Sequence, residues 1–178
     1  MAAPHSSVFN APLMALRQQN LGPMALRTPL PHGLRLQSDT AAVITGTMAS
    51  PRGRLLTLNT TVQNSATWFA FRLTLGQADF TGLAGLGFWL RSAAQRAMIS
   101  RACLRSGQDD GSHIDHYYDQ YILSQAAQTD HHALLMFDRA PTIPITALWR
   151  EFILFLPTTQ SLDCSLIDLR FFTIETGL

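Results

Sequence analysis

The chain has 178 residues, with 13 basic and 12 acidic residues and a formal net charge of +1. A chain of this length is typical of one domain, and balanced charge totals favour neither nucleic acid nor any other strongly charged partner. Every basic residue is an arginine, and Glu151 and Glu175 are the only glutamates. This composition excludes mechanisms that need a catalytic lysine or a pair of glutamates. It also favours strands over helices, because Lys and Glu usually cover exposed helical faces.

The first 40 residues are rich in proline and glycine. Prolines at this density are expected to prevent a continuous helix or a central strand. We therefore expect residues 1–40 to form an extended N-terminal arm and residues 41–178 to form the folded domain. Removal of the arm is expected to leave that domain folded. The start of the chain lacks the basic and apolar regions of a secretory signal, which predicts synthesis in the cytoplasm without a signal peptide.

The tetrapeptide Met-Ala-Leu-Arg occurs twice in this N-terminal segment. In an extended chain, Met and Leu of each copy would face one side and Arg the other. Apolar side chains of this kind need a surface that buries them, either the chain's own sandwich or another subunit. Chance similarity between two short stretches is the alternative. We expect partner docking through both copies, with the arginines fixing the register: Met14, Leu16, Arg17, Met24, Leu26 and Arg27.

From Ala41 onward, apolar and polar residues alternate with a period of two. The alternation predicts strands over residues 55–62, 68–75, 86–92, 98–104, 117–123, 133–137, 149–156 and 164–174. Short strands separated by turn residues are typical of two packed antiparallel sheets. We predict an all-β fold, a β-sandwich of jelly-roll type. No apolar run reaches the roughly 18 residues of a membrane helix, so no membrane insertion is expected. Cys103 and Cys164 are expected to be free thiols.

The densest polar stretch covers residues 106–120. His113 and His116 could share a divalent metal with Asp115 or Asp119, because imidazole and carboxylate together suit zinc or manganese. The alternative is a solvated loop that leads into a strand. No second ligand set stands at a diagnostic spacing, so we predict no metal and no cofactor. Asp115 and Asp119 are the best carboxylate pair for a glycosidase. Nothing in the sequence positions them, and no catalytic residue is predicted.

Aromatic residues in and near this stretch could bind a sugar, and Trp68 and Trp89 are also available. Aromatic rings stack on the C–H faces of pyranoses, while carboxylates bind their hydroxyl groups. The alternative is that each tryptophan fills the core or an edge of the sandwich. The candidate carbohydrate-binding residues are Trp89, Asp115, Tyr117, Tyr118, Asp119 and Tyr121.

The end of the chain carries a family resemblance. The run LWREFILFLP at residues 148–157, followed by LDCSLIDLRFF at residues 162–172, resembles the last strands of galactose-binding-like jelly rolls. Many carbohydrate-binding modules use this fold. The resemblance implies a fold, since the same architecture hosts sugar binding, protein docking and structural roles. No ligand residue is carried over by a motif.

A second, contextual resemblance rests on residues 1–40 alone. An extended arm joined to a compact domain is similar to small β-sandwich proteins of tailed-phage-like particles, including gene transfer agents. The leading hypothesis is a non-enzymatic subunit of a multi-protein assembly, a surface spike or spike base of a virion or phage-like particle. It would be a homo-oligomer that docks through its arm. The second hypothesis is a carbohydrate-binding module for cell-surface polysaccharide, and both can hold together.

Overall fold

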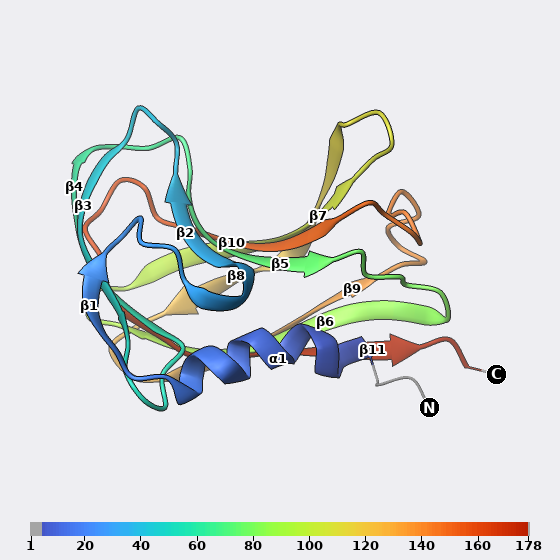
Figure 1. Ribbon diagram of the computed structural model, residues 1–178, viewed down its shortest axis with the longest axis horizontal. Helices are drawn as coiled ribbons and strands as arrows, with labels where there is room; N and C mark the ends of the chain where they lie inside the picture. Colours follow the sequence, from blue (N-terminus) through green and yellow to red (C-terminus); the bar gives the residue numbers. More distant parts are fainter. Residues whose placement is uncertain (1–4, 178) are drawn as a thin grey trace.

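The computed structural model describes residues 5–177, which form two antiparallel sheets packed face to face (Figure 1). The six-stranded sheet has the order β1-β3-β4-β11-β6-β9. Its strands are β1 (Leu21–Ala25), β3 (Val43–Ser50), β4 (Leu56–Asn64), β11 (Asp163–Glu175), β6 (Leu83–Ala94) and β9 (Thr129–Met136). The five-stranded sheet has the order β2-β5-β10-β7-β8. Its strands are β2 (Leu34–Ser38), β5 (Phe69–Gly76), β10 (Arg150–Leu156), β7 (Met98–Gly107) and β8 (His113–Ser124).

This architecture confirms the predicted all-β sandwich of jelly-roll type, and each predicted strand overlaps an observed one. The core lies between the sheets and is filled by alternate residues of each strand. Phe152 of β10 lies at its centre. Its ring centroid is 5.2 Å from that of Phe88 on β6 and 5.0 Å from that of Phe171 on β11. Two helical elements precede β2: α1 (His5–Gln18) and a short 3-10 turn η1 (Pro31–Gly33).

The helix α1 corrects the expectation of an extended arm. Residues 5–18 are helical although Pro12 lies inside the helix. Phe9, Leu13 and Leu16 follow a spacing of four and three residues, which places them on one helical face. They are only 3%, 1% and 0% exposed. Burying three large apolar side chains outweighs the roughly 3 kcal/mol that an interior proline costs. The first four residues of the predicted arm lie outside the described residues.

α1 covers an edge of β11 that β4 leaves free. β4 pairs with β11 only from Asp163 to Leu166, whereas β6 pairs along almost the whole strand. Beyond that point α1 runs beside β11 (Figure 1). The side-chain amide of Asn10 donates to the Phe171 carbonyl at 2.9 Å and accepts from the Phe171 N–H at 2.7 Å. One side chain therefore supplies the pair of hydrogen bonds that a neighbouring strand would have made.

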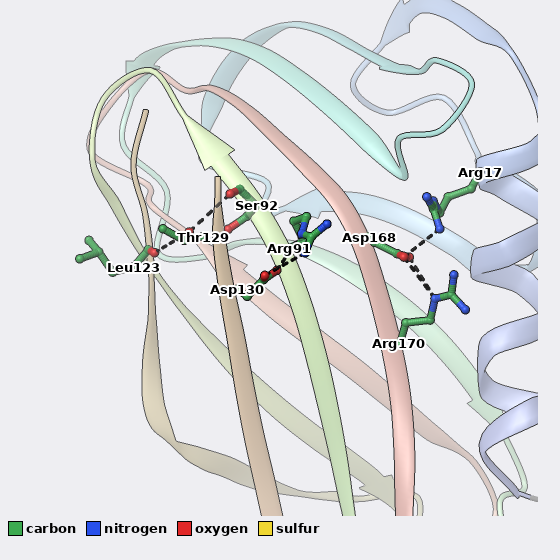
Figure 2. A network of polar contacts seen from close by, with 8 residues as sticks. All are labelled: Arg17, Arg91, Ser92, Leu123, Thr129, Asp130, Asp168 and Arg170. Carbon is green, nitrogen blue, oxygen red and sulfur yellow. Dashed lines mark hydrogen bonds and ion pairs between the residues drawn. The ribbon is translucent and has the colours of Figure 1, made fainter. Parts of the chain in front are cut away.

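An ion-pair cluster fixes the end of the helix to the same strand. Figure 2 shows Arg17 of α1 and Arg170 of β11 both pointing at Asp168. Their nitrogens lie 2.8 Å and 3.2 Å from Asp168 Oδ2. Arg17 also donates to the carbonyl of Gly53 at 3.3 Å. Asp168 is only 7% exposed, and its buried carboxylate forms ion pairs with arginines from both α1 and β11. Arg17 makes these bonds within the chain.

The two copies of Met-Ala-Leu-Arg adopt different structures. The first copy lies in α1, whereas Met24 and Ala25 of the second lie in β1 and Leu26 follows it. Leu16 and Leu26 are buried in the chain's own core, so these two side chains are unavailable to a partner. The N-terminal 40 residues also contribute a strand to each sheet. β1 is an edge strand of the six-stranded sheet, and β2 is an edge strand of the five-stranded sheet. The predicted boundary at residue 40 therefore passes through both sheets.

Gly46 in β3 supports a testable prediction about this sheet. Its φ is +135°, and an added Cβ would meet the backbone carbonyl of Asn59 on β4. We expect Gly46→Ala to lower the free energy of unfolding by about 1–3 kcal/mol because the backbone must shift. Chemical denaturation measures the change. Gly22→Ala is the matched control, since a Cβ there meets open space; equal stability of the two variants would contradict the prediction.

Candidate ligand-binding groove

A groove of about 680 Å³ runs over the outer face of the five-stranded sheet. Its floor includes Ala70 of β5 and Ile153 of β10, which form with the buried Cys103 of β7 a small apolar cluster separate from the main core. These three strands lie side by side in the order β5-β10-β7 (Figure 1). The solvent-facing side of an antiparallel sheet is normally polar. Here the centre of the sheet is apolar on both faces, and Ala70, Cys103 and Ile153 are 0%, 0% and 2% exposed because neighbouring side chains cover them.

Aromatic side chains stand on and around this floor. Trp68, just before β5, and Phe155 of β10 pack against the floor cluster. Tyr117 of β8 also lines the groove. Its ring centroid is 6.1 Å from that of Phe155, with an angle of 30° between the planes. The groove thus offers three rings, of which two lie at a shallow angle to each other. The wall on the side of Trp68 is completed by Thr67, Leu156, Pro157, Thr158 and Thr159.

Asp39 holds the turn that carries Trp68. Its carboxylate accepts hydrogen bonds from the backbone N–H and the hydroxyl of Thr67, and from the Trp68 N–H at 3.4 Å. The hydroxyl bond is the main reason why the pKa of Asp39 lies below its usual value. The Asp39 N–H also donates to the Trp68 carbonyl at 3.2 Å. The backbone of Trp68 is therefore held in place without a ligand, which limits the conformational entropy that the protein would lose on binding one.

The cations of the groove come from β5 and β7, the two strands on either side of β10. Arg72, Arg101 and Arg105 line it, and no acidic residue within 5–177 does. Arg72 and Arg35 both donate to the buried carboxylate of Glu151, so two guanidinium groups share one acid. These contacts place a network of fixed hydrogen-bond donors along one side of the apolar floor.

Arg105 has its own acidic partner. It makes two hydrogen bonds of 2.7 Å to Asp115. The hydrogen bond from Arg105 is the main cause that lowers the pKa of Asp115. A carboxylate with a lowered pKa stays ionised near neutral pH and is unsuited to act as a general acid.

Arg101 is different from its neighbours. Its guanidinium carbon lies 4.1 Å from the ring centroid of Tyr117 and 5.5 Å from that of Tyr121. Across the sheet Arg101 is opposite Phe155 on one side and Tyr121 on the other. Among residues 5–177, no carboxylate lies within ion-pair distance of it. Arg101 is thus a cation held by aromatic rings without an acidic partner.

The structure brings together some of the predicted carbohydrate-binding residues and separates others. Tyr117 lines the groove, and Asp115 is paired with Arg105, which also lines it. Tyr121 lies beside Arg101, with 63% of its surface exposed. Asp119 is exposed on β8 but is not among the residues that line the groove.

Tyr118 and Trp89 lie away from this face. Tyr118 is fully buried in the core, with its ring centroid 4.9 Å from that of Phe88, and burial raises the pKa of its hydroxyl. Neighbouring residues of a strand point to opposite faces, so Tyr117 and Tyr118 could not both face a ligand. Trp89 belongs to β6 of the other sheet and lies against Arg91, at 5.1 Å.

The two candidate metal ligands also diverge. A separation of three residues along a strand puts His113 and His116 on opposite faces of β8. His113 is exposed, whereas His116 is buried and its Nε2 lies 2.9 Å from the Thr142 hydroxyl. Burial is the main reason why the pKa of His116 is lowered. Across residues 5–177, no group of three or more His, Cys, Asp or Glu side chains is placed to hold a metal ion.

Sequence reasoning missed most of the groove. Trp68 was named as an available aromatic residue but was not assigned to the site, and the missed residues are Arg72, Arg101, Arg105, Ile153, Phe155, Thr158 and Thr159. One signal was present: residues 152–156 are all apolar, although a strand with one wet face normally alternates. The arginines gave no signal, because their proximity depends on the strand order.

Comparisons with known proteins find structural neighbours only. No protein-family model and no curated protein sequence matches the chain. A structure reported under the description "CBM4 structure and function" has a TM-score of 0.57 at 10% identity, over 84% of this chain and 94% of that one. The CBM22-1 xylan-binding domain of Paenibacillus barcinonensis Xyn10C has a TM-score of 0.54 at 7% identity, over 89% and 99% of the two chains.

A third neighbour is the family 11 carbohydrate-binding module of Clostridium thermocellum, in complex with a β-1,3-1,4-mixed-linked tetrasaccharide. Its TM-score is 0.54 at 9% identity, over 89% of this chain and 100% of that one. The fold is that of carbohydrate-binding-module β-sandwiches. At such low identity the likeness establishes the fold alone. No helix in residues 5–177 is long and apolar enough to cross a membrane.

Proposed function

We propose that the chain is a non-catalytic carbohydrate-binding module that holds a polysaccharide in the groove of the five-stranded sheet. The observation that carries the proposal is the second apolar cluster, with aromatic rings above it, on the solvent-facing side of that sheet. A sugar ring has apolar C–H faces and polar hydroxyl edges. Trp68, Phe155 and Tyr117 supply surfaces for the faces, and the arginines supply donors for the hydroxyl groups.

The size and setting of the groove agree with this ligand class. A volume of about 680 Å³ lies within the range of roughly 300–1,000 Å³ that small-molecule sites occupy. The walls are built by strands and by a turn that Asp39 fixes, so the site is largely formed before a ligand arrives. Structural neighbours bind xylan and a mixed-linked glucan tetrasaccharide, which adds support from proteins of the same fold.

A non-catalytic role agrees with the carboxylates of this face. Glycoside hydrolysis requires one carboxyl group that stays protonated and a second that faces it across the sugar. Asp115 is bonded to Arg105, and Glu151 is bonded to Arg35 and Arg72. Carboxylates that are paired with guanidinium groups are poorly suited to transfer protons to a sugar, which agrees with a site that binds a sugar without cleaving it.

The hypothesis of an assembly subunit stays a prediction. It rested on an N-terminal arm that needs a partner for burial, whereas α1, β1 and β2 pack on the chain itself. Of the six residues assigned to docking, Met14 and Arg27 are exposed. A homo-oligomer or a phage-like particle therefore draws no support from the residues that first indicated it.

Variants of the groove test the proposal. The full chain is screened against immobilised plant, bacterial and animal polysaccharides, and hits are measured by isothermal titration calorimetry. We expect Trp68→Ala and Phe155→Ala each to weaken binding at least tenfold, about 1.4 kcal/mol, because each removes an aromatic stacking surface. Trp89→Ala is the matched control, as this tryptophan is also partly exposed but lies in the other sheet.

The outcomes separate clearly. Unchanged binding by Trp89→Ala and loss in the groove variants, with melting temperatures close to that of the unaltered chain, support the proposal. Loss in Trp89→Ala alone would move the site to the other sheet. Absence of binding to every polysaccharide would refute the proposed function.

A further inference from the structure

We infer that the polysaccharide is anionic, with carboxylates on its sugar rings, and that Arg101 is the residue that recognises them. The inference rests on the proposed function and specifies its ligand class. Among the residues that the structure describes, three arginines and no acidic residue line the groove, although the whole chain carries a net charge of only +1. The positive groups are therefore concentrated where the ligand would lie.

The three arginines differ in how far they are neutralised. Arg105 is matched by Asp115 through two hydrogen bonds. Arg72 shares Glu151 with Arg35, so one carboxylate serves two cations. Arg101 has no acidic partner among residues 5–177. The unbalanced positive charge lies at Arg101, with a smaller excess beside Arg72.

The surroundings of Arg101 suit a carboxylate. Its guanidinium lies over Tyr117 and near Tyr121. A guanidinium that stacks through its face keeps its in-plane N–H donors free, and two of them match the two oxygens of a carboxylate. Phe155 is opposite Arg101 on the next strand. An acidic sugar could therefore place its ring on Phe155 or Tyr117 while its carboxylate reaches Arg101.

A neutral glycan would make poorer use of this site. A cation without a partner next to an apolar floor is less screened than one in open solvent, so an anion gains more there. Neutral hydroxyl groups would bind Arg101 by hydrogen bonds without cancelling its charge. The remaining polar residues of the groove, Thr67, Thr158 and Thr159, carry no charge. Discrimination between acidic and neutral sugars therefore depends mainly on Arg101, with a smaller contribution from the excess charge beside Arg72.

Paired polysaccharides test the inference. The full chain is titrated with polygalacturonate, alginate and hyaluronan, each beside its methyl-esterified form, and with neutral xylan and mixed-linked glucan. We expect at least one acid form to bind at least tenfold more tightly than its ester. That advantage should fall steeply when NaCl is raised from about 50 to 500 mM, as charge screening requires. Arg101→Gln should remove this advantage, because it should weaken binding of the acid form at least tenfold more than binding of the ester.

Arg91→Gln is the matched control. Arg91 also lies over an aromatic ring, at 5.1 Å from Trp89, but it is paired with Asp130 on the other sheet (Figure 2). Its variant should keep the tenfold preference. Equal loss in both variants would show a general charge effect and overturn the assignment to Arg101.

The remaining outcomes distinguish the inference from the proposed function. Equal affinity for acid and ester forms, or binding to neutral glycans alone, would overturn the inference while the proposed function stands. Binding to no glycan would overturn both. An oligothymidylate probe is included, because aromatic and basic grooves also bind single-stranded nucleic acid. Affinity for it equal to that for the acidic glycan would overturn the inference.

Discussion

Deleting residues 1–19 should abolish cooperative folding of the sandwich. Phe9, Leu13 and Leu16 belong to the main core, and truncation of one such side chain typically costs about 2–5 kcal/mol. The summed cost of losing all three side chains is comparable with the whole free energy of unfolding of a typical domain, roughly 5–15 kcal/mol. Thermal unfolding followed by near-ultraviolet circular dichroism should show no cooperative transition. A sharp transition near that of the full chain would contradict this.

Point variants within α1 test individual contacts of the helix, whereas the deletion tests the helix as a whole. Asn10→Ala should lower the free energy of unfolding by about 1–3 kcal/mol, because the Phe171 N–H and carbonyl lose their partners. Met14→Ala is the control on the same helix. Its side chain is 44% exposed, so a change within about 0.5 kcal/mol is expected.

Replacing Arg150 should produce the largest loss of stability of any single arginine that we describe. Arg150 is 0% exposed. Its guanidinium lies 3.9 Å from the ring centroid of Phe80, and burial lowers its pKa to about 10. It donates to the carbonyls of Ala78, Pro144 and Ile145 and to the hydroxyl of Ser106. One side chain thus joins the segments before β6 and β10 to strand β7.

Arg150→Met should therefore cost at least about 3 kcal/mol, since several buried acceptors lose a charged donor together. Arg150→Lys should also be destabilising, because one ammonium cannot reach acceptors spread around a planar fork. Urea denaturation measures both. Arg96→Met replaces an exposed arginine and should change stability by less than about 0.5 kcal/mol. A loss in Arg150→Met no greater than in this control would show that the bonds contribute little.

The strands could be predicted from the sequence because alternation reports directly on burial at one sheet face. β5 illustrates this: Phe69, Phe71 and Leu73 face the core, and Ala70 and Arg72 face outward. The helix could not be predicted by counting prolines. Its signal was the spacing of Phe9, Leu13 and Leu16, which indicates one apolar helical face despite Pro12.

The groove was largely beyond sequence reasoning for a topological reason. Phe155 and Arg101 are far apart in the chain and become neighbours only because β10 lies between β5 and β7. Tyr117 was named because it lies in an aromatic-rich stretch, and it does line the groove, while its contact with a sugar stays a prediction. Tyr118 was wrongly grouped with it, although strand geometry allows only one of two adjacent residues to face outward.

The position of α1 beside β11 decides how this protein can be joined to other molecules. Asn10 and Phe171 are hydrogen bonded, so the beginning of the helix and the end of the last strand leave from the six-stranded sheet (Figure 1). The groove opens on the opposite layer. A fluorescent reporter or a surface tether attached at either terminus would therefore leave the aromatic rings free to meet a polymer.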